Sequence, residues 1–164
     1  MMLQKKICIL GPTGVGKTSL IKQYVDGIFS EKYLTSIGVK IDKKIIDSMF
    51  TPVQLMLWDL EGIDKYCGFN PRYLRGAAAY VIVMDQTRSA SFVEAIEVYK
   101  EAQKHTDVPA ILVINKSDLP PAINWAQNDI ETVGALFKGV FNTSAKTGSQ
   151  VEDMFTFLAK TIMD

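Results

Sequence analysis

Short apolar runs alternate with amphipathic segments along the chain. The apolar runs are rich in Val, Ile, Leu and Met, which is typical of buried strands in a largely parallel sheet. A more polar segment at residues 37–46 is typical of an edge strand, and a turn at residues 47–52 leads from it into the next run. The buried runs are residues 6–10, 53–58, 79–85, 110–115 and 140–142.

The segments between these runs change to a helical period, with apolar residues recurring three and four positions apart. Three stripes are clear, and a weaker one covers residues 125–137. We expect the stripes to pack in the core rather than to bind a ligand. Their members are Leu20, Ile21, Tyr24 and Val25; Phe92, Ala95, Ile96 and Tyr99; and Val151, Met154, Phe155, Leu158 and Ile162.

Strands that alternate with helices at this spacing predict βαβ units with right-handed crossovers. We therefore expect an α/β fold with a mostly parallel six-stranded sheet, one antiparallel edge strand and helices on both faces. Residues 1–164 would form one domain. Ligands of such sheets gather beside the carboxyl ends of the strands, so the segments that follow the strands are where chemistry is expected.

The composition excludes no class of function outright, but it argues against several. The 18 Lys and Arg residues balance 18 Asp and Glu residues, which gives no support for nucleic acid as a partner. No apolar run approaches the roughly 20 residues that a membrane helix needs, so we expect no membrane insertion of this chain. Cys8 and Cys67 have no metal-like neighbours, which favours a reducing compartment. A cytoplasmic protein is expected, or one peripheral to a membrane if a tail lies outside this chain.

The first buried run is followed directly by a phosphate-loop motif, G-x-x-x-x-G-K-[ST], satisfied in full at residues 11–18. Small residues let the backbone curl so that successive N–H groups face phosphate oxygens. Lys17 would bring a positive charge to the terminal phosphates, and the Thr18 hydroxyl would ligate Mg²⁺. A Gly-rich turn without a ligand explains the motif poorly, because it lies between a strand and a helix. The predicted phosphate contacts in this segment are Gly11, Thr13, Gly14, Val15, Gly16, Lys17, Thr18 and Ser19.

Kinases, ATPases and GTPases all use this loop, but a second motif indicates guanine. Asn115-Lys116-Ser117-Asp118 is an N-K-x-D motif that follows a buried run. The Asp118 carboxylate can accept two N–H bonds from the guanine edge, a pattern that adenine does not present. The Lys116 stem can cover one face of the base, and Asn115 can tie this segment to the phosphate loop. Alone the motif is weak, since an Asn-Asp turn explains it nearly as well.

A third motif, Thr143-Ser144-Ala145-Lys146, again comes just after a strand. The backbone N–H of Ala145 could meet the guanine carbonyl oxygen. This motif is also weak alone, but the three motifs in order, each at the end of a strand, form a strong signal. The predicted base contacts in the two later motifs are Asn115, Lys116, Asp118, Ser144, Ala145 and Lys146.

With these motifs the chain resembles the Ras superfamily of small GTPases, and most of all its Rab branch. The resemblance covers essentially the whole chain. Residues 33–39 read Y-L-T-S-I-G-V where Rab proteins have Y-x-x-T-I-G-V, and residues 73–77 read Y-L-R-G-A where they have Y-Y-R-G-A. The resemblance implies a phosphate-loop NTPase G domain that binds GTP or GDP with Mg²⁺. It also implies switch I at residues 29–39 and switch II at residues 60–75, both ordered by the γ-phosphate and Mg²⁺, through which protein effectors and regulators would bind.

The resemblance also assigns roles to single residues. Phe29 would contact the guanine edge-on, Tyr33 would close over the phosphates, and Gly62 would donate its N–H to the γ-phosphate. Asp59 would hold Mg²⁺ through water, since this ion usually keeps several waters. Ser36 stands where the family has the Thr that ligates Mg²⁺, and it keeps the hydroxyl.

Two of these assignments have alternatives. Thr35 lies beside Ser36 and competes for the Mg²⁺ ligand role. Ile41, Trp58 and Tyr73 lie where Rab proteins keep a hydrophobic triad that meets effectors, with Ile41 in place of the family's Phe. A core role for Trp58 explains that residue at least as well.

The main departure from the family lies in switch II, where D-T-A-G-Q is here Asp59-Leu60-Glu61-Gly62-Ile63. Ile63 replaces the Gln that orients the attacking water, and it neither donates nor accepts a hydrogen bond. Phosphoryl transfer in this class is mostly positioning and charge stabilisation, and loss of a positioned proton-handling group costs about 10²- to 10⁴-fold. We expect intact affinity and slow intrinsic hydrolysis, with Lys17 and Gly62 still stabilising charge. Glu61 or Asp64 is the alternative water-orienting group.

Three functions share these motifs. One is a GTPase switch that cycles with help from exchange and activating proteins. Another is a GTP-loaded pseudo-GTPase that recruits partners and hardly turns over; Ile63 favours a slow cycle without deciding between the two. The third, an ATP-using phosphate-loop kinase, would need an adenine site and a lid, and Asp118 argues against it.

Overall fold

The computed structural model describes residues 2–29, 39–47, 51–60 and 70–163, and six strands in these ranges form one sheet. The strand order is β2-β3-β1-β4-β5-β6. β2 is antiparallel to β3, and every other neighbouring pair is parallel, so the predicted mixed sheet is confirmed. The strands are β1 (Leu3–Leu10), β2 (Val39–Ile46), β3 (Val53–Leu60), β4 (Ala77–Asp85), β5 (Ala110–Asn115) and β6 (Val140–Asn142).

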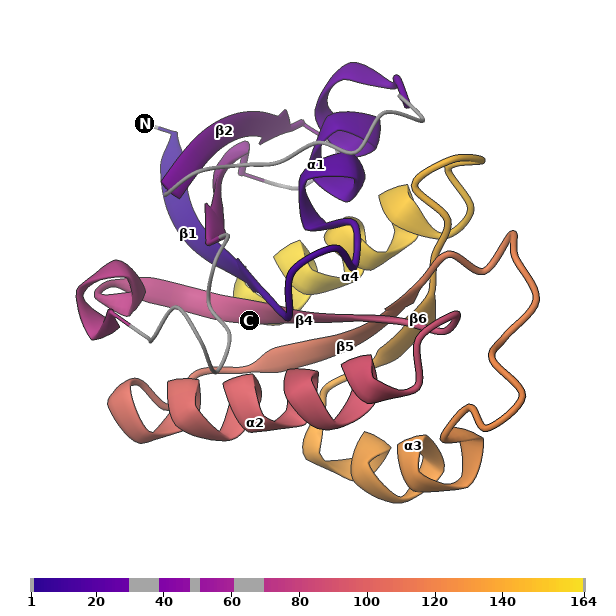
Figure 1. Cartoon of the computed structure of the whole chain (residues 1–164). Coiled ribbons are helices and arrows are strands. Elements are labelled where there is room, and N and C mark those ends of the chain that lie inside the picture. Colours follow the sequence, from indigo (N-terminus) through magenta and orange to yellow (C-terminus); the bar gives the residue numbers. More distant parts are fainter. Residues whose placement is uncertain (1, 30–38, 48–50, 61–69, 164) are drawn as a thin grey trace.

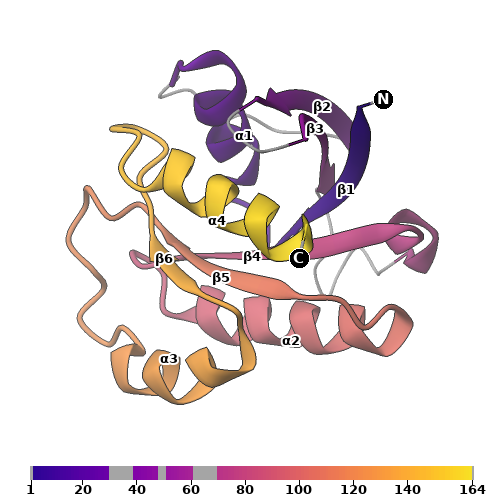
Figure 2. The ribbon, with the colours of Figure 1, turned by 180° about the vertical axis from the view of Figure 1, so that it is seen from behind.

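Helices cover both faces of this sheet. Figure 1 and, from behind, Figure 2 show α1 and α4 on one face and α2 and α3 on the other. This arrangement follows from the connections, because parallel neighbours are joined by crossovers that pass over a face of the sheet. The helices are α1 (Lys17–Asp26), α2 (Ala90–His105), α3 (Gln127–Val133) and α4 (Val151–Met163), with short 3₁₀ helices η1 (Pro71–Leu74) and η2 (Gly134–Leu136).

Alternating side chains of β1 divide the core into two layers. Ile7 and Ile9 belong to the layer under α1 and α4, whereas Cys8 and Leu10 belong to the layer under α2 and α3. This alternation is the two-residue period of a strand that is covered on both faces. The predicted apolar stripes of the helices lie in these same layers, so they form the core as expected.

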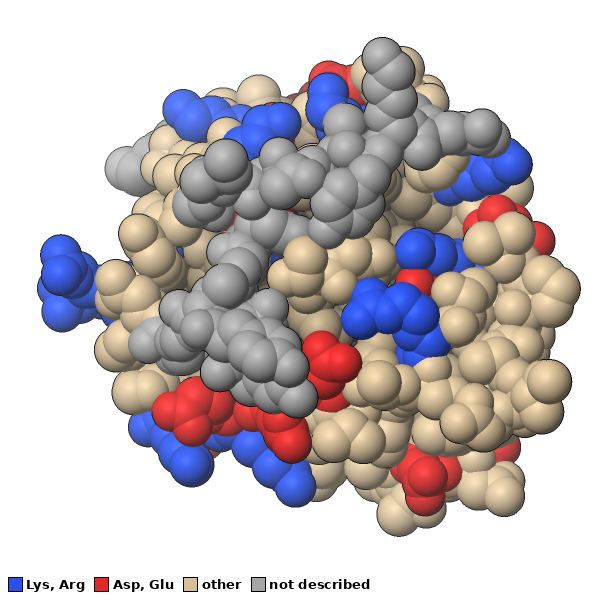
Figure 3. Space-filling model, in the orientation of Figure 1, with Lys and Arg blue, Asp and Glu red and all other residues tan. Residues whose placement is uncertain are grey.

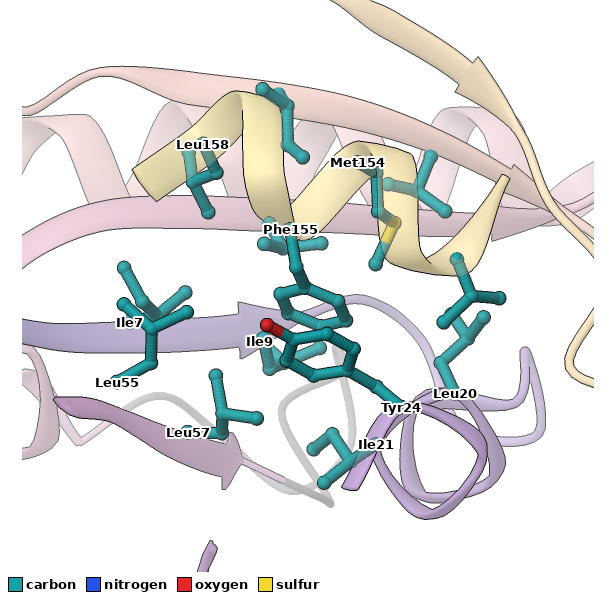
Figure 4. Packing of buried hydrophobic residues seen from close by; sticks show 14 of the residues in the cluster. Ile7, Ile9, Leu20, Ile21, Tyr24, Leu55, Leu57, Met154, Phe155 and Leu158 are labelled. Carbon is teal, nitrogen blue, oxygen red and sulfur yellow. The ribbon is translucent and has the colours of Figure 1, made fainter. Parts of the chain in front are cut away.

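The layer under α1 and α4 fixes the helix that follows the phosphate loop. Tyr24 of α1 stacks on Phe155 of α4, with ring centroids 4.1 Å apart and an interplanar angle of 15° (Figure 4). Burial, with a smaller contribution from the charge of Glu152, raises the pKa of the Tyr24 hydroxyl to about 12. Because α1 is held in this way, the loop before it is anchored at the helix end.

Some predicted boundaries differ from the structure. β1 begins at Leu3 rather than at residue 6, because Gln4 and Lys5 pair with β3 although their side chains are polar. The helix predicted at residues 125–137 is shorter: α3 ends at Val133, and the chain continues through η2. Gly134 explains the change, since glycine lowers the preference for α-helix. Residues 37 and 38 of the predicted edge strand lie outside the described residues.

Candidate functional site

The predicted site segments meet at one edge of the sheet. β3, β1, β4, β5 and β6 pair with one another in parallel, so their carboxyl ends share that edge. Hydrogen bonds join the loop between β1 and α1 to the segments that follow β4 and β5, from Arg88 to Thr13 and from Lys116 to Gly14. This is the position at which open α/β sheets bind ligands.

The loop between β1 and α1 curls around the ammonium group of Lys17. Gly14 and Gly16 have positive φ values of 83° and 99°, which glycine adopts without steric cost. Lys17 is 1% exposed, and its Nζ donates to the carbonyl oxygens of Gly11 at 3.0 Å and Pro12 at 2.9 Å. A glycine-containing loop with an enclosed positive charge at a helix N-terminus suits a phosphate chain.

Asn115 ties the base segment to this loop. Its Nδ2 donates to the carbonyl oxygen of Val15 at 2.9 Å, and its Oδ1 accepts from the Thr143 hydroxyl at 3.1 Å. Gly16 permits this approach, because a Cβ at that position would lie 2.4 Å from Asn115 Nδ2. The tie that the N-K-x-D motif predicted is therefore present, and it also reaches the third motif.

Two oxygen ligands suited to Mg²⁺ lie beside the phosphate loop. The Thr18 hydroxyl donates to Asp59 Oδ2 at 2.5 Å, and Asp59 is fully buried in β3. A hydroxyl that donates its hydrogen keeps lone pairs for a cation, and Mg²⁺ is usually held by one or two carboxylates together with substrate phosphates. The pair thus fits the ion. The third predicted ligand, Ser36, and its alternative Thr35 lie outside the described residues.

The Asp118 carboxylate, which the sequence predicts to read guanine, is hydrogen-bonded to the third motif. The Ser144 hydroxyl donates to Asp118 Oδ1 at 2.8 Å and accepts the backbone N–H of Thr147 at 3.0 Å. The Ala145 carbonyl accepts from Gln23 Nε2 at 2.7 Å, so the motif is also attached to α1. Gln23 was missed from the sequence, where it stands as one polar residue of a helix.

Two further predicted base contacts lie at the surface. Phe29 is 38% exposed and ends the first described range. Lys146 is exposed and follows Ala145 in the loop after β6. Neither position is contradicted, and their roles stay predictions.

Lys116 bridges the base segment, the phosphate loop and β4. Its Nζ donates to the Gly14 carbonyl oxygen at 3.2 Å and lies 2.8 Å from Asp85 Oδ2. Asp85 ends β4 and is fully buried. The sequence analysis missed this carboxylate, although Asp85 closes a buried run as Asp59 and Asn115 do.

Arg88, in the segment between β4 and α2, also contacts the phosphate loop. Its Nη1 donates to the carbonyl oxygen of Thr13 at 2.9 Å, and the side chain is exposed. The contact adds a positive charge to the outside of the loop. A single arginine in a loop gives no spacing pattern, so the sequence alone had no means of finding it.

Several predicted residues lie outside the described ranges, and their placement is not part of the site described above. They are Tyr33 of switch I, Gly62 and Ile63 of switch II, and the alternative water-orienting residues Glu61 and Asp64.

The residues of the predicted hydrophobic triad lie on and beside the antiparallel pair of strands. Ile41 is directly opposite Trp58 in the register of β2 and β3. Ile41 is 44% exposed and Tyr73, in η1, is 38% exposed. Trp58 is half-buried against the core, and Lys6 Nζ lies 3.7 Å from its ring centroid. Trp58 thus packs against the core, as one of its two alternatives expected, and its contact with effectors stays a prediction.

The described surface carries both signs of charge. Figure 3 shows Lys and Arg side chains interspersed with Asp and Glu side chains on one face. Among the helices in the described ranges, none has the length and apolar character needed to cross a bilayer.

Comparison with known proteins identifies the family to which this site belongs. Residues 6–164 match the family described as Ras family. The chain belongs to the Ras family. The phosphate-loop and guanine motifs are therefore those of a GTP-binding switch, and the resemblance recognised in the sequence is confirmed. The alternative of an ATP-using kinase loses its support.

Rab proteins from distant organisms are among the relatives of this Ras family chain. It is 32% identical over 168 residues to Ras-related protein Rab-32 of Homo sapiens, covering 96% of this chain and 74% of that protein. It is 30% identical over 161 residues to Ras-related protein SEC4 of Saccharomyces cerevisiae, covering 97% and 75%. It is 35% identical over 162 residues to Ras-related protein RABF2b of Arabidopsis thaliana, covering 96% and 80%. Ras family GTPases hydrolyse GTP, and they bind GTP and GDP typically with Mg²⁺.

Proposed function

We propose that this Ras family switch binds GTP and GDP with Mg²⁺ in the described pocket and hydrolyses GTP very slowly. The observation that carries the binding proposal is the pair of bonds from Asn115 to Val15 and from Lys116 to Gly14. These bonds hold the base-reading segment against the phosphate loop, so one ligand with a purine and a phosphate chain can contact both.

At the phosphate end, Lys17 and the loop amides neutralise and orient the phosphates. A bound Mg²⁺ would supply charge neutralisation for the phosphates. Thr18, Asp59 and Ser36 are the residues that would hold it. Gly62 would donate its N–H to the γ-phosphate, and Tyr33 would cover the phosphates.

At the base end, Asp118 accepts the two N–H groups of the guanine edge, and the Ala145 N–H donates to the guanine carbonyl oxygen. The bond from Ser144 to Asp118 supports this role, because it fixes the carboxylate that must face the base. Lys116 and Phe29 would cover the base, and Lys146 would border it.

Hydrolysis requires water to add to the γ-phosphorus while the bond to the β–γ bridging oxygen breaks, which gives GDP and inorganic phosphate. Ile63 stands where the family's Gln orients that water, and its side chain provides no hydrogen bond. The lost positioning is expected to slow this step by about 10²- to 10⁴-fold, whereas binding does not use the side chain.

Single-turnover hydrolysis of preloaded GTP tests this proposal. We expect Ile63→Gln to cleave GTP at least about tenfold faster than the unaltered protein, with the same affinity for GDP. Ile63→Leu is the matched control, because it keeps an apolar side chain of the same size and should remain slow.

Equal rates for Ile63→Gln and the unaltered protein would contradict the role of Ile63 and point to Glu61 or Asp64 as the water-orienting group. Undetectable turnover together with GTP in the denatured, freshly purified protein would favour the GTP-loaded pseudo-GTPase that recruits partners.

Effectors and regulators would bind through switch I and switch II. The exposure of Ile41 and Tyr73 supports this part of the proposal, since exposed apolar side chains beside a switch suit a protein interface. A cytoplasmic location stays a prediction.

A further inference from the structure

A buried carboxylate that the predicted site did not include lies between the base segment and the phosphate loop. Asp85 closes β4, and its Oδ1 accepts the backbone N–H of Thr87 at 2.8 Å and the Thr87 hydroxyl at 2.6 Å. Its backbone N–H donates to the buried Ser91 hydroxyl at 2.9 Å. These bonds fix the carboxylate from its own segment and direct its Oδ2 to Lys116.

Lys116 is the flexible member of the pair. Its side chain is 34% exposed, against 0% for Asp85, and a lysine stem has many rotamers of similar energy in water. A buried carboxylate is costly without a cation, so the pair favours the one rotamer that brings Nζ to Asp85. In that rotamer Nζ also reaches the Gly14 carbonyl oxygen.

We propose that Asp85 is a positioning residue for nucleotide binding, which acts by holding Lys116 against the phosphate loop. This inference rests on the proposed function, in which the Lys116 stem covers the base. It predicts that Asp85 governs how long either guanine nucleotide stays bound. Asp85 does not govern the choice of base, because Asp118 and Ser144 are held independently of it.

A purely local role for Asp85 is the competing explanation. The carboxylate also braces the segment after β4 through Thr87, so its loss could disturb that segment alone. The two explanations differ in one respect: a local brace acts whether or not position 116 is a lysine, and a positioning role requires that lysine.

The experiment measures dissociation of a fluorescent GDP analogue, chased with excess GDP in Mg²⁺ buffer, for a set of variants. Asp85→Asn removes the charge at constant shape. It is expected to speed dissociation of the GDP analogue roughly 10- to 100-fold, because the charge-assisted bond to Lys116 is lost. Thr87→Val removes only the hydroxyl bond to Oδ1 and is expected to change the rate less than about threefold. Each variant is also unfolded thermally to establish that it folds.

The deciding comparison places Asp85→Asn in a Lys116→Met background, where it should change the rate less than about threefold, because coupled residues give non-additive effects. Lys116→Gln takes the place of Lys116→Met if the latter does not fold. The preference for GDP over ADP should be unchanged by Asp85→Asn.

Three results would overturn the inference. They are an unchanged dissociation rate in Asp85→Asn, equal dissociation rates in Asp85→Asn and Thr87→Val, or an effect of Asp85→Asn in the Lys116→Met background as large as that in the unaltered protein. A wild-type protein that binds no guanine nucleotide would instead remove the proposed function on which the inference rests. The two failures are therefore distinguishable.

Discussion

At the base end of the pocket, Asp118 and Lys116 each contact another polar side chain, whereas at the phosphate end Lys17 donates to backbone carbonyl oxygens. Ser144 fixes Asp118, and Asp85 faces Lys116. Lys17, by contrast, is bound by the carbonyl oxygens of Gly11 and Pro12 in its own loop. The base end thus presents a hydrogen-bonded carboxylate, and the phosphate end presents a positive charge enclosed by its own loop.

This difference separates affinity from selectivity. In the proposed pocket, groups at the phosphate end would contact parts that all nucleotides share, so their loss should weaken the binding of every nucleotide. Groups at the base end would contact parts that differ between nucleotides, so their loss should change which nucleotide is preferred. Four substitutions, taken from the largest expected effect to the smallest, test the distinction.

Lys17→Ala is expected to have the largest effect. It removes the cation that we propose faces the terminal phosphates, and loss of one partner of a buried charge pair is expected to weaken GDP and GTP binding about 100- to 1000-fold. Lys22→Ala, on the same helix, lowers the net charge equally and should change the Kd little. Calorimetric titration measures both, and an unchanged Kd in Lys17→Ala would show that the phosphate end lies elsewhere.

Asp118→Asn should alter selectivity rather than affinity for phosphates. An amide cannot accept both N–H groups of guanine but can pair with the carbonyl of xanthine, so GDP should weaken about 100-fold while xanthosine diphosphate gains. Ser144→Ala is the matched control, since it frees the carboxylate without changing its chemistry and should weaken GDP without a gain for the xanthine nucleotide. Competition with a fluorescent GDP analogue measures these preferences, and retained guanine preference in Asp118→Asn would remove the base-reading role.

Gly16→Ala tests the junction between the two ends. Gly16 and Gly27 both have positive φ, but only at Gly16 would a Cβ meet another group, Asn115 Nδ2 at 2.4 Å. Gly27→Ala should lower the free energy of unfolding by about 1 kcal/mol through backbone strain and leave the Kd for GDP unchanged. Gly16→Ala should also weaken GDP roughly tenfold, because the tie to Val15 is displaced. Equal Kd values in the two variants would mean that this tie does not support binding.

The smallest effect is expected at Cys8, which lies in the core layer under α2 and α3. Burial raises the pKa of its thiol from 9.0 to about 12. Between pH 9 and pH 12 the folded state therefore keeps a thiol proton that the unfolded state loses. The contribution of the protonated Cys8 to the free energy of unfolding is complete below pH 9 and is lost as the pH rises towards 12.

Urea unfolding between pH 7 and pH 11 checks this expectation. Above pH 9, the unfolding free energy of Cys8→Ala should fall less steeply with pH than that of the unaltered protein, by a slope that corresponds to at most one bound proton. Near pH 7 the two proteins should show the same pH dependence. An identical fall above pH 9 in the two proteins would place the titrating group elsewhere.

The same contrast explains what the sequence could and could not predict. Strands and helices with regular apolar periods can be recognised in the sequence, so the sheet and most helices could be predicted. The polar start of β1 and the end of α3 before Gly134 could not. The motif residues were found because their spacing is fixed by the ligand. Asp85 and Arg88 were missed because their partners lie far away in the sequence, at Lys116 and Thr13, and only the folded chain brings them together.

The most direct test of the central claim is calorimetric titration of the nucleotide-free protein with GDP, GTP and ATP in the presence of Mg²⁺. Because Asp118 can pair with guanine and not with adenine, GDP and GTP should bind at least about 100-fold more tightly than ATP. Equal affinity for the three nucleotides would contradict a pocket that combines a phosphate loop with a guanine-reading carboxylate.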